Sequence, residues 1–294
     1  MPELVYAVVL ASVYLLFALG LSICWGTIDV LNFAHGSVFL FSAYAVHLVI
    51  EQVRLPLAAM VLAGAAVGAA LSVLVHYLAF EPIRRRALRR DREMQMLIVG
   101  VGIAAIPVAV VNHATAGNPF GFDTSSFDLG VHRILSVPVT SVQLLIVAVA
   151  TVTTVVVAAW LRWSRRGLAL RAIGVDDETA LMMGVDRARL AVLTMAFSGA
   201  LAGVAGVMLT LSFGALTPIS GEFLIIKAFA VIIVGGVGSV VGVAVGALIL
   251  ATAETLLLTF TSGSWVDAVS FGMIFVLLLL RPAGLLARRK AVRT

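Results

Sequence analysis

The chain has 294 residues, of which 62% are hydrophobic and 12% are charged, and its mean hydropathy is +1.12. Soluble domains carry roughly a quarter charged residues, so this composition excludes an ordinary soluble protein and indicates one transmembrane domain over residues 1–294. The net charge is +5, but the basic residues fall in short clusters between apolar runs. That distribution is typical of membrane-protein loops and gives no indication of a nucleic-acid partner.

The apolar runs predict an all-α polytopic membrane protein, because a spanning helix takes about 20 mainly apolar residues. The runs cover residues 4–25, 33–50, 55–80, 94–113, 141–161, 190–214, 223–235, 239–260 and 266–280. The first run has no basic segment before it and no clear cleavage site after it, so we interpret it as a membrane helix and not as a signal peptide. The run that ends at Gly235 is too short to span and leads into Gly-Gly-Val-Gly, which indicates a broken or re-entrant helix. We therefore expect about eight or nine transmembrane or partly re-entrant helices.

Three basic clusters predict the orientation of these helices, because Lys and Arg gather in cytoplasmic loops. The clusters are Arg84, Arg85, Arg86, Arg89, Arg90 and Arg92; Arg162, Arg165, Arg166, Arg171, Arg187 and Arg189; and Arg281, Arg288, Arg289, Lys290 and Arg293. The loop at 114–140 contains one basic residue, Arg133, and is expected on the opposite side. Counting three crossings back from the first cluster places the N-terminus outside, provided that the run at 33–50 crosses the membrane.

Glycines recur four residues apart in several of the apolar runs. They are Gly64 and Gly68, Gly199 and Gly203, and Gly238, Gly242 and Gly246. This spacing lets two helix backbones approach closely in lipid. We interpret these positions as helix-packing contacts and not as substrate contacts.

The sequence lacks the usual motifs of an enzyme. Neither of its two lysines, Lys227 and Lys290, stands in the G-x-x-x-x-G-K-[ST] pattern that cradles nucleotide phosphates. There is no G-x-S-x-G or H-E-x-x-H motif, the histidines are scattered, and the single cysteine, Cys24, excludes an intrachain disulfide. We expect a non-catalytic chain that binds no cofactor and no metal ion itself.

Few ionisable residues lie in or near the apolar runs. The candidates are Lys227, Glu254, Asp29 and Asp267. An ion-coupled carrier normally has several such groups in a relay, so an autonomous secondary carrier or facilitator for small polar solutes is the weaker alternative. Lys227 and Glu254 lie in consecutive runs and could pair in the solute path; the alternative is a structural ion pair or a snorkelling side chain.

The longest predicted cytoplasmic connection, at about 163–189, carries its own helix signals. Asp176 is a good N-cap, acidic residues follow it, and Gly184 suits a left-handed C-terminal cap. About seven helical residues lie between the caps, and they display Leu181, Met182 and Met183. So short a helix is marginal in water. We expect it to dock against the membrane surface, its own bundle or a groove on a soluble partner.

These motifs resemble the permease subunits of ABC importers for branched-chain amino acids. The resemblance is carried first by residues 167–208, with Arg-Ala-Ile-Gly, Asp-Asp-Glu-Thr-Ala, Met-Gly-Val and Phe-Ser-Gly-Ala-Leu-Ala-Gly-Val-Ala-Gly-Val. Asn-Phe-Ala-His-Gly at 32–36, Lys-Ala-Phe at 227–229, Gly-Gly-Val-Gly-Ser at 235–239 and Glu254 agree in order with the family's other signatures. Val240 and Val241 depart from the Ile-Pro that often stands there, and Ser37 occupies a variable position. These departures leave the substrate open, because relatives in this family also import urea or short-chain amides.

The resemblance implies a permease in the bacterial inner membrane that forms half of a translocation pathway. Its implied partners are a second permease subunit, homologous or identical, two cytoplasmic ATPase subunits that use ATP and Mg, a periplasmic or lipid-anchored binding protein, and membrane lipid. The implied ATPase-coupling residues are Arg171, Asp176, Asp177, Ala180, Met183 and Gly184. The candidate translocation path comprises Asn32, His35, Lys227, Gly235, Gly236, Gly238, Ser239 and Glu254. A structural role for His35 remains the alternative, as does a non-transporting membrane scaffold or intramembrane enzyme for the chain.

Overall fold

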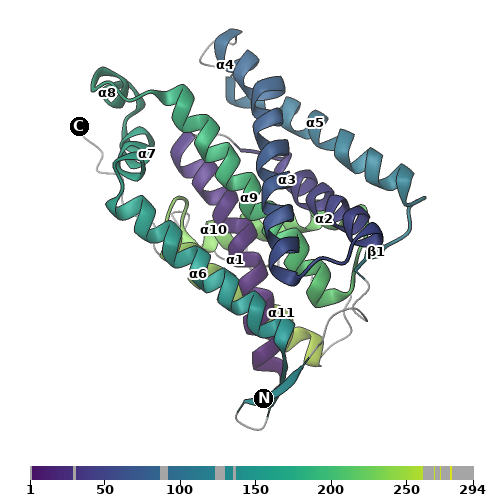
Figure 1. Cartoon of the computed structure of the whole chain (residues 1–294). Coiled ribbons are helices and arrows are strands. Elements are labelled where there is room, and N and C mark those ends of the chain that lie inside the picture. Colours follow the sequence, from purple (N-terminus) through teal and green to yellow (C-terminus); the bar gives the residue numbers. More distant parts are fainter. Residues whose placement is uncertain are drawn as a thin grey trace. The chain divides into compact units, whose positions relative to one another are not determined.

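The computed structural model describes residues 2–28, 31–86, 92–122, 130–134 and 137–260, with single positions at 268, 272 and 279. Its helices are α1 (Pro2–Ile28), α2 (His35–Gln52), α3 (Leu57–Val75), the π-helix η1 (His76–Phe80), α4 (Glu81–Arg86), α5 (Arg92–Ala114), α6 (Ser141–Trp163), α7 (Arg165–Val175), α8 (Asp177–Met182), α9 (Arg187–Phe213), α10 (Ser220–Gly235) and α11 (Val240–Phe260). Its strands are β1 (Phe120–Gly121), β2 (Val131–Ile134), β3 (Val137–Thr140) and β4 (Ala215–Leu216). Figure 1 shows the helices that dominate the fold.

The prediction of a polytopic helical membrane protein is confirmed. Each of the first eight apolar runs coincides with a helix, and the ninth, at 266–280, lies outside the described residues apart from isolated positions. Within the described part, six helices are long and apolar enough to cross a membrane. They cover Glu3–Gly26, Leu57–Arg86, Met94–Ala114, Ser141–Trp163, Arg187–Phe213 and Val240–Phe260. The remaining two, α2 with 18 residues and α10 with 16, are not among the six.

The chain divides into two compact units, each assembled from separate stretches of sequence. Unit 1 contains Met1–Ser22, Gly130–Arg187 and Ile226–Thr294, and unit 2 contains Ile23–Leu129 and Ala188–Ile225. Two short antiparallel strand pairs, which the sequence did not indicate, accompany the helices: β2 with β3 in unit 1 and β1 with β4 in unit 2. The expectation of one transmembrane domain over residues 1–294 stays a prediction.

In unit 1, helix α6 connects a β-hairpin at its N-terminus to the short helix α7 at its C-terminus. The β2–β3 hairpin leads into α6, and Thr140 begins that helix with a capping box in which its hydroxyl and the Gln143 side chain each bond the other residue's backbone N–H. At the far end, Ser164 accepts a hydrogen bond from the Gly167 amide and so caps α7. The N-terminus lies near the hairpin, at the end of α6 opposite α7 and α8 (Figure 1).

Helices α10 and α11 form a close hairpin in unit 1. A Cβ at Gly242 would collide with the carbonyl oxygen of Gly235, and a Cβ at Gly246 would collide with that of Val231. Gly236 and Gly238 have φ values of +97° and +76°, which side chains rarely adopt, and they make the turn between the helices. The packing role predicted for Gly242 and Gly246 is therefore confirmed, whereas Gly238 serves the turn.

In unit 2, α3 and α9 cross through the two glycine pairs that the sequence indicated. A Cβ at Gly68 would collide with the carbonyl oxygen of Gly199, and a Cβ at Gly203 would collide with that of Gly64. Backbones can approach this closely only where neither residue carries a side chain, and such contacts maximise van der Waals attraction in a solvent that offers no hydrophobic effect. The crossing therefore places the polar residues of α3 and α9 against one another.

We expect Gly199→Ala to destabilise unit 2 by about 1–3 kcal/mol, because the added methyl group forces α3 and α9 apart. Thermal unfolding of the purified protein in detergent measures the loss. Gly102→Ala is the matched control, since Gly102 also lies in a helix of unit 2 but a Cβ there would meet nothing within 4 Å. A stability loss as large for the control as for Gly199→Ala would show that the crossing is not the cause.

Candidate functional site

Unit 1 contains an intramembrane cluster of three polar side chains. The Lys227 ammonium group on α10 lies 3.0 Å from Oε1 and 3.1 Å from Oε2 of Glu254 on α11. The Tyr14 hydroxyl on α1 donates to Glu254 Oε2 over 2.6 Å and accepts from Lys227 Nζ over 3.1 Å. The carboxylate is 1% exposed and the lysine side chain 16% exposed. The predicted pairing of Lys227 with Glu254 is therefore confirmed.

The cluster satisfies its own charges. Burial of an ionised group is expensive unless it is paired and hydrogen-bonded, and here the carboxylate receives bonds from both the ammonium and the phenol. Tyr14 was missed at the sequence level because one tyrosine in an apolar helix gives no periodic or charge signal. These bonds connect α1, α10 and α11. They favour a structural role for the ion pair over a role in the solute path.

The glycine-rich segment next to the cluster is also satisfied internally. Ser239 accepts a hydrogen bond from the Gly242 amide and so caps α11, and the Gly238 amide donates to Ser22 Oγ on α1 over 3.1 Å. Gly235 and Gly236 close the end of α10, where the Gly236 amide bonds the Ile232 carbonyl. The structure thus joins the later family signature to Glu254 through one helical hairpin, in which the glycines serve packing and the turn.

The earlier signature, which contains Asn32 and His35, lies in unit 2. His35 begins α2 and is fully buried, and its Nδ1 lies 3.3 Å from Ser198 Oγ on α9. Asn32 is also fully buried, yet neither atom of its amide group has a hydrogen-bond partner among the described residues. The two residues therefore differ: His35 is held by α9, whereas Asn32 has unused hydrogen-bonding capacity.

The loop at 163–189 has the predicted capped helix, α8, preceded by a second helix, α7, that the sequence did not indicate. Asp176 Oδ1 accepts from the Thr179 amide, and its Oδ2 accepts from the Thr179 hydroxyl. These bonds hold the pKa of Asp176 below its usual value, so the cap stays ionised at neutral pH. Gly184 has φ +82°, and the Val185 amide bonds the Ala180 carbonyl, which is the expected left-handed cap.

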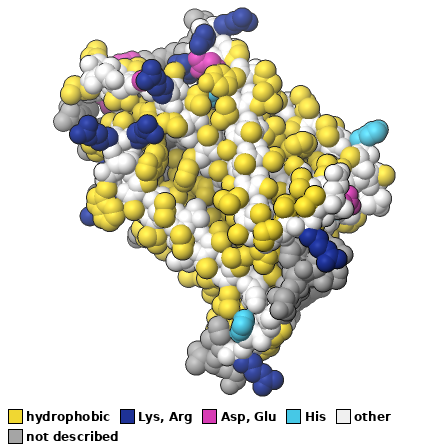
Figure 2. Space-filling view, viewed as in Figure 1, with side chains coloured by type: hydrophobic (Ala, Val, Ile, Leu, Met, Phe, Trp, Pro, Cys, Tyr) yellow, Lys and Arg dark blue, Asp and Glu magenta, His cyan; other side chains and the backbone are white. Residues whose placement is uncertain are grey.

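One face of this loop packs against the protein and the other exposes large apolar side chains. Ala180 is 4% exposed, whereas Met182 and Met183 are 88% and 81% exposed. Figure 2 shows Lys and Arg side chains among hydrophobic ones at the end of unit 1 where Figure 1 places α7 and α8. Arg171 reaches back to the carbonyl of Arg162, and the side chain of Asp177 lies outside the described residues. The exposed methionines are therefore available to a partner, together with other exposed apolar side chains of the loop such as Val175 and Leu168.

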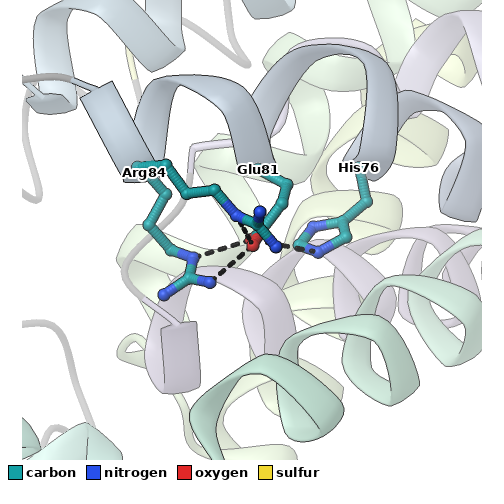
Figure 3. Close-up of polar contacts among 4 residues, drawn as sticks. His76, Glu81 and Arg84 are labelled. Atoms are coloured by element: carbon teal, nitrogen blue, oxygen red, sulfur yellow. Dashed lines mark hydrogen bonds and ion pairs between the residues drawn. The ribbon is translucent and has the colours of Figure 1, made fainter.

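A charged cluster in unit 2 includes a carboxylate that the sequence reasoning missed. Glu81 on α4 accepts two hydrogen bonds from Arg84, over 2.8 and 2.7 Å, and one from Arg85 over 2.7 Å. His76 Nε2 on η1 lies 3.9 Å from Glu81 Oε2, so the imidazole and the Arg84 guanidinium group approach one carboxylate (Figure 3). Arg84 and Arg85, the first two arginines of the predicted basic cluster, are thus held in place by the Glu81 carboxylate on α4.

We expect Lys227→Met and Glu254→Gln each to destabilise unit 1 by about 3–5 kcal/mol, because each leaves the other member of a buried pair without its partner. The double variant should lose clearly less than the two single losses added together. Unfolding in detergent provides the four free energies of the cycle, with Thr255→Val as a control for a nearby buried change on α11. Additive losses would contradict a coupled pair.

Comparison with known proteins identifies the family of this chain. Residues 4–278 match the family described as the permease component of the branched-chain amino acid transport system. The high-affinity branched-chain amino acid transport system permease protein LivH of Salmonella typhimurium is 28% identical over 98% of this chain and 96% of its own length. BraD of Pseudomonas aeruginosa, which bears the same description, is 29% identical over the same shares. The fructose import permease protein FruF of Bifidobacterium longum is 24% identical over 90% of this chain and 73% of its own length. This chain therefore belongs to the family of permease components of branched-chain amino acid transport systems.

Proposed function

We propose that this chain, a non-catalytic permease subunit of an ABC importer, forms half of a pathway that carries branched-chain or related amino acids across the bacterial inner membrane. The observation that carries the proposal is α8, a capped helix with exposed methionines, on a chain whose sequence has no nucleotide-binding motif. Such a surface suits a groove on a separate ATPase subunit. Relatives named for branched-chain amino acids support the substrate class, and a family member for urea or amides is the alternative.

The proposed partners follow from this division of labour. Two cytoplasmic ATPase subunits would bind ATP and Mg, a periplasmic or lipid-anchored binding protein would deliver the solute, and a second permease, homologous or identical, would complete the pathway. Closure of the ATPases would push α8, and α7 would pass the displacement to the end of α6, where Gly167 packs against the backbone of Leu161. Coupling then depends on an element with two discrete positions.

The proposed topology places α7 and α8 in the cytoplasm. Because the N-terminus lies near the β2–β3 hairpin in unit 1, at the far end of α6 from these helices, it would lie outside, as expected from the basic clusters. Helix α2 is proposed to cross the membrane and α10 to be a partly re-entrant segment. Together with the six long helices and the run at 266–280 they give nine segments, the upper of the two expected numbers. Asn32 and His35 remain the candidate path residues of unit 2, and a path role for Lys227, Glu254 and the 235–239 turn stays a prediction.

Replacing both exposed methionines, Met182→Asp with Met183→Asp, should abolish binding to the ATPase subunits and ATP-driven uptake. The reason is that two charges cannot enter an apolar groove without large desolvation. Co-purification and uptake by reconstituted complexes are the measurements. Val131→Asp is the matched control, because Val131 is 63% exposed in the hairpin at the other end of unit 1. Unchanged ATPase binding in the methionine variant would count against α8 as the docking element.

The purified chain alone in liposomes should accumulate no leucine, whereas the complex with ATPases, partner permease and binding protein should do so only when ATP is present. Robust uptake by the chain alone under a proton or sodium gradient would favour the carrier alternative. Uptake of urea or acetamide by the complex, without uptake of leucine, would reassign the substrate within the family. The ATP-independent rate of the complex is the baseline for both comparisons.

A further inference from the structure

Unpartnered polar atoms concentrate in one part of the described structure. Six buried side-chain nitrogen or oxygen atoms have no hydrogen-bond partner there, and five of them belong to unit 2. They are both amide atoms of Asn32, Ser72 Oγ, His76 Nδ1 and Thr194 Oγ1. These four residues are at most 3% exposed. Each unsatisfied buried group costs about 1–3 kcal/mol, so this concentration requires an explanation.

The groups on α3, η1 and α9 share one interface. Ser72 and His76 are four residues apart in a continuous helical segment, so they lie on the same side of it. Ser72 lies directly against Gly199 on α9, where a Cβ would collide with the serine Cβ. Thr194 is one helical turn before Ser198 on α9, and the two helices run antiparallel through their glycine crossing. Thr194 and His76 are thus both displaced from that crossing toward the same end of unit 2.

The start of α2 lies at the same interface. His35 on its first turn contacts Ser198 Oγ, and Asn32 precedes it by three residues. One apolar cluster contains Ala34, Val75 and Met195, which are sequence neighbours of His35, His76 and Thr194. The backbone segments that carry Asn32, His76 and Thr194 therefore meet at one apolar cluster.

Other buried hydroxyl groups in the described part of unit 2 do not behave this way. Thr210, on the same helix as Thr194, donates to the Gly206 carbonyl, and Ser42 on α2 donates to the Val38 carbonyl. Bonding to the carbonyl four residues earlier is the usual solution for hydroxyls inside membrane helices. Since Thr194 and Ser72 have the same local option and do not use it, their hydroxyls are available to another partner.

The π-helix connects this interface to the charged cluster. The Glu81 amide bonds the His76 carbonyl, five residues back, which widens the turn and redirects the side chains around it. His76 thereby has Nδ1 at the interface and Nε2 near the Glu81 carboxylate, which Arg84 holds (Figure 3). The polar groups thus continue from the start of α2 to arginines of the first basic cluster.

We propose that Asn32, Ser72, His76 and Thr194 form a polar seam, which opens to water in another state of unit 2 and conducts the charged head group of the transported zwitterion. This inference rests on the proposed import of an amino acid. The structure shows the seam closed, with its hydrogen-bonding atoms unused, and opening would satisfy them with water or solute.

The chemistry of the seam suits a group that carries both charges. The Asn32 amide donates and accepts, the two hydroxyls do both, and no side chain caps the N-terminus of α2, where a helix attracts a carboxylate. Hydroxyl, imidazole and amide acceptors serve the ammonium group. No carboxylate belongs to the seam itself, so the solute meets no ion pair strong enough to retain it.

Cysteine labelling of the reconstituted complex tests the seam. In a Cys24→Ala background, Thr194→Cys and Ser72→Cys are compared with the matched controls Thr210→Cys and Ser42→Cys, which are equally buried but satisfied. A hydrophilic methanethiosulfonate reagent, applied during ATP turnover, should modify the two seam cysteines at least about tenfold faster than the controls, because access governs thiol reactivity. Saturating leucine should slow the modification of the seam cysteines alone.

Equal labelling of all four cysteines, or seam labelling that leucine leaves unchanged, would overturn the proposal. Asn32→Leu gives a second readout: uptake should fall to background while thermal stability is unchanged or raised, because two unsatisfied atoms are removed. Lower stability with normal uptake would instead identify Asn32 as a structural residue. Leucine uptake by the unsubstituted complex tests the proposed function separately, so its absence is distinguishable from a failure of the seam.

Discussion

Water is missing from the core of a bilayer, and the rest of this structure follows from that absence. Every backbone group has to be satisfied within the protein, which leaves helices as the main element of the described chain. Polar side chains face the same demand, and most of them meet it locally, as Thr210 and Ser42 do with carbonyls of their own helices. Lys227 and Glu254 meet it across helices, with the Tyr14 hydroxyl as a third member.

The two units differ in how fully their buried polar side chains are hydrogen-bonded. In unit 1, the polar groups of Tyr14, Lys227 and Glu254 are bonded to one another, so this cluster stabilises the contact between their helices. In unit 2, Asn32, Ser72, His76 and Thr194 retain unsatisfied atoms although water cannot reach them in this conformation. A conformation that is stable overall but locally unsatisfied is what a transport protein requires, because a moderate displacement can then exchange protein contacts for solvent or solute.

Much of the fold was predictable because hydropathy and glycine spacing report directly on lipid and on helix crossing. The apolar runs located the membrane helices, Asp176 and Gly184 located the caps of α8, and the ion pair was expected from two charges in consecutive runs. Tyr14 and Ser198 were not predictable, since their partners lie 240 and 163 residues away and nothing local marks them. Glu81 was missed although arginines follow it three and four residues later, a spacing that predicts helical ion pairs. The division into units also escaped prediction, because each unit is assembled from distant stretches.

The hairpin of α10 and α11 has a consequence for biogenesis. A lysine at the centre of a 16-residue helix makes that helix a poor candidate for entering the bilayer by itself, since one central charge opposes insertion by about 2.5–3.5 kcal/mol. Insertion of α10 and α11 as one hairpin, which their glycine turn favours, would bring the ammonium group and the carboxylate into the membrane as a neutral pair. Tyr14 is synthesised earlier than both residues, so its hydroxyl would be present in the membrane to hydrogen-bond Lys227 and Glu254 when they enter.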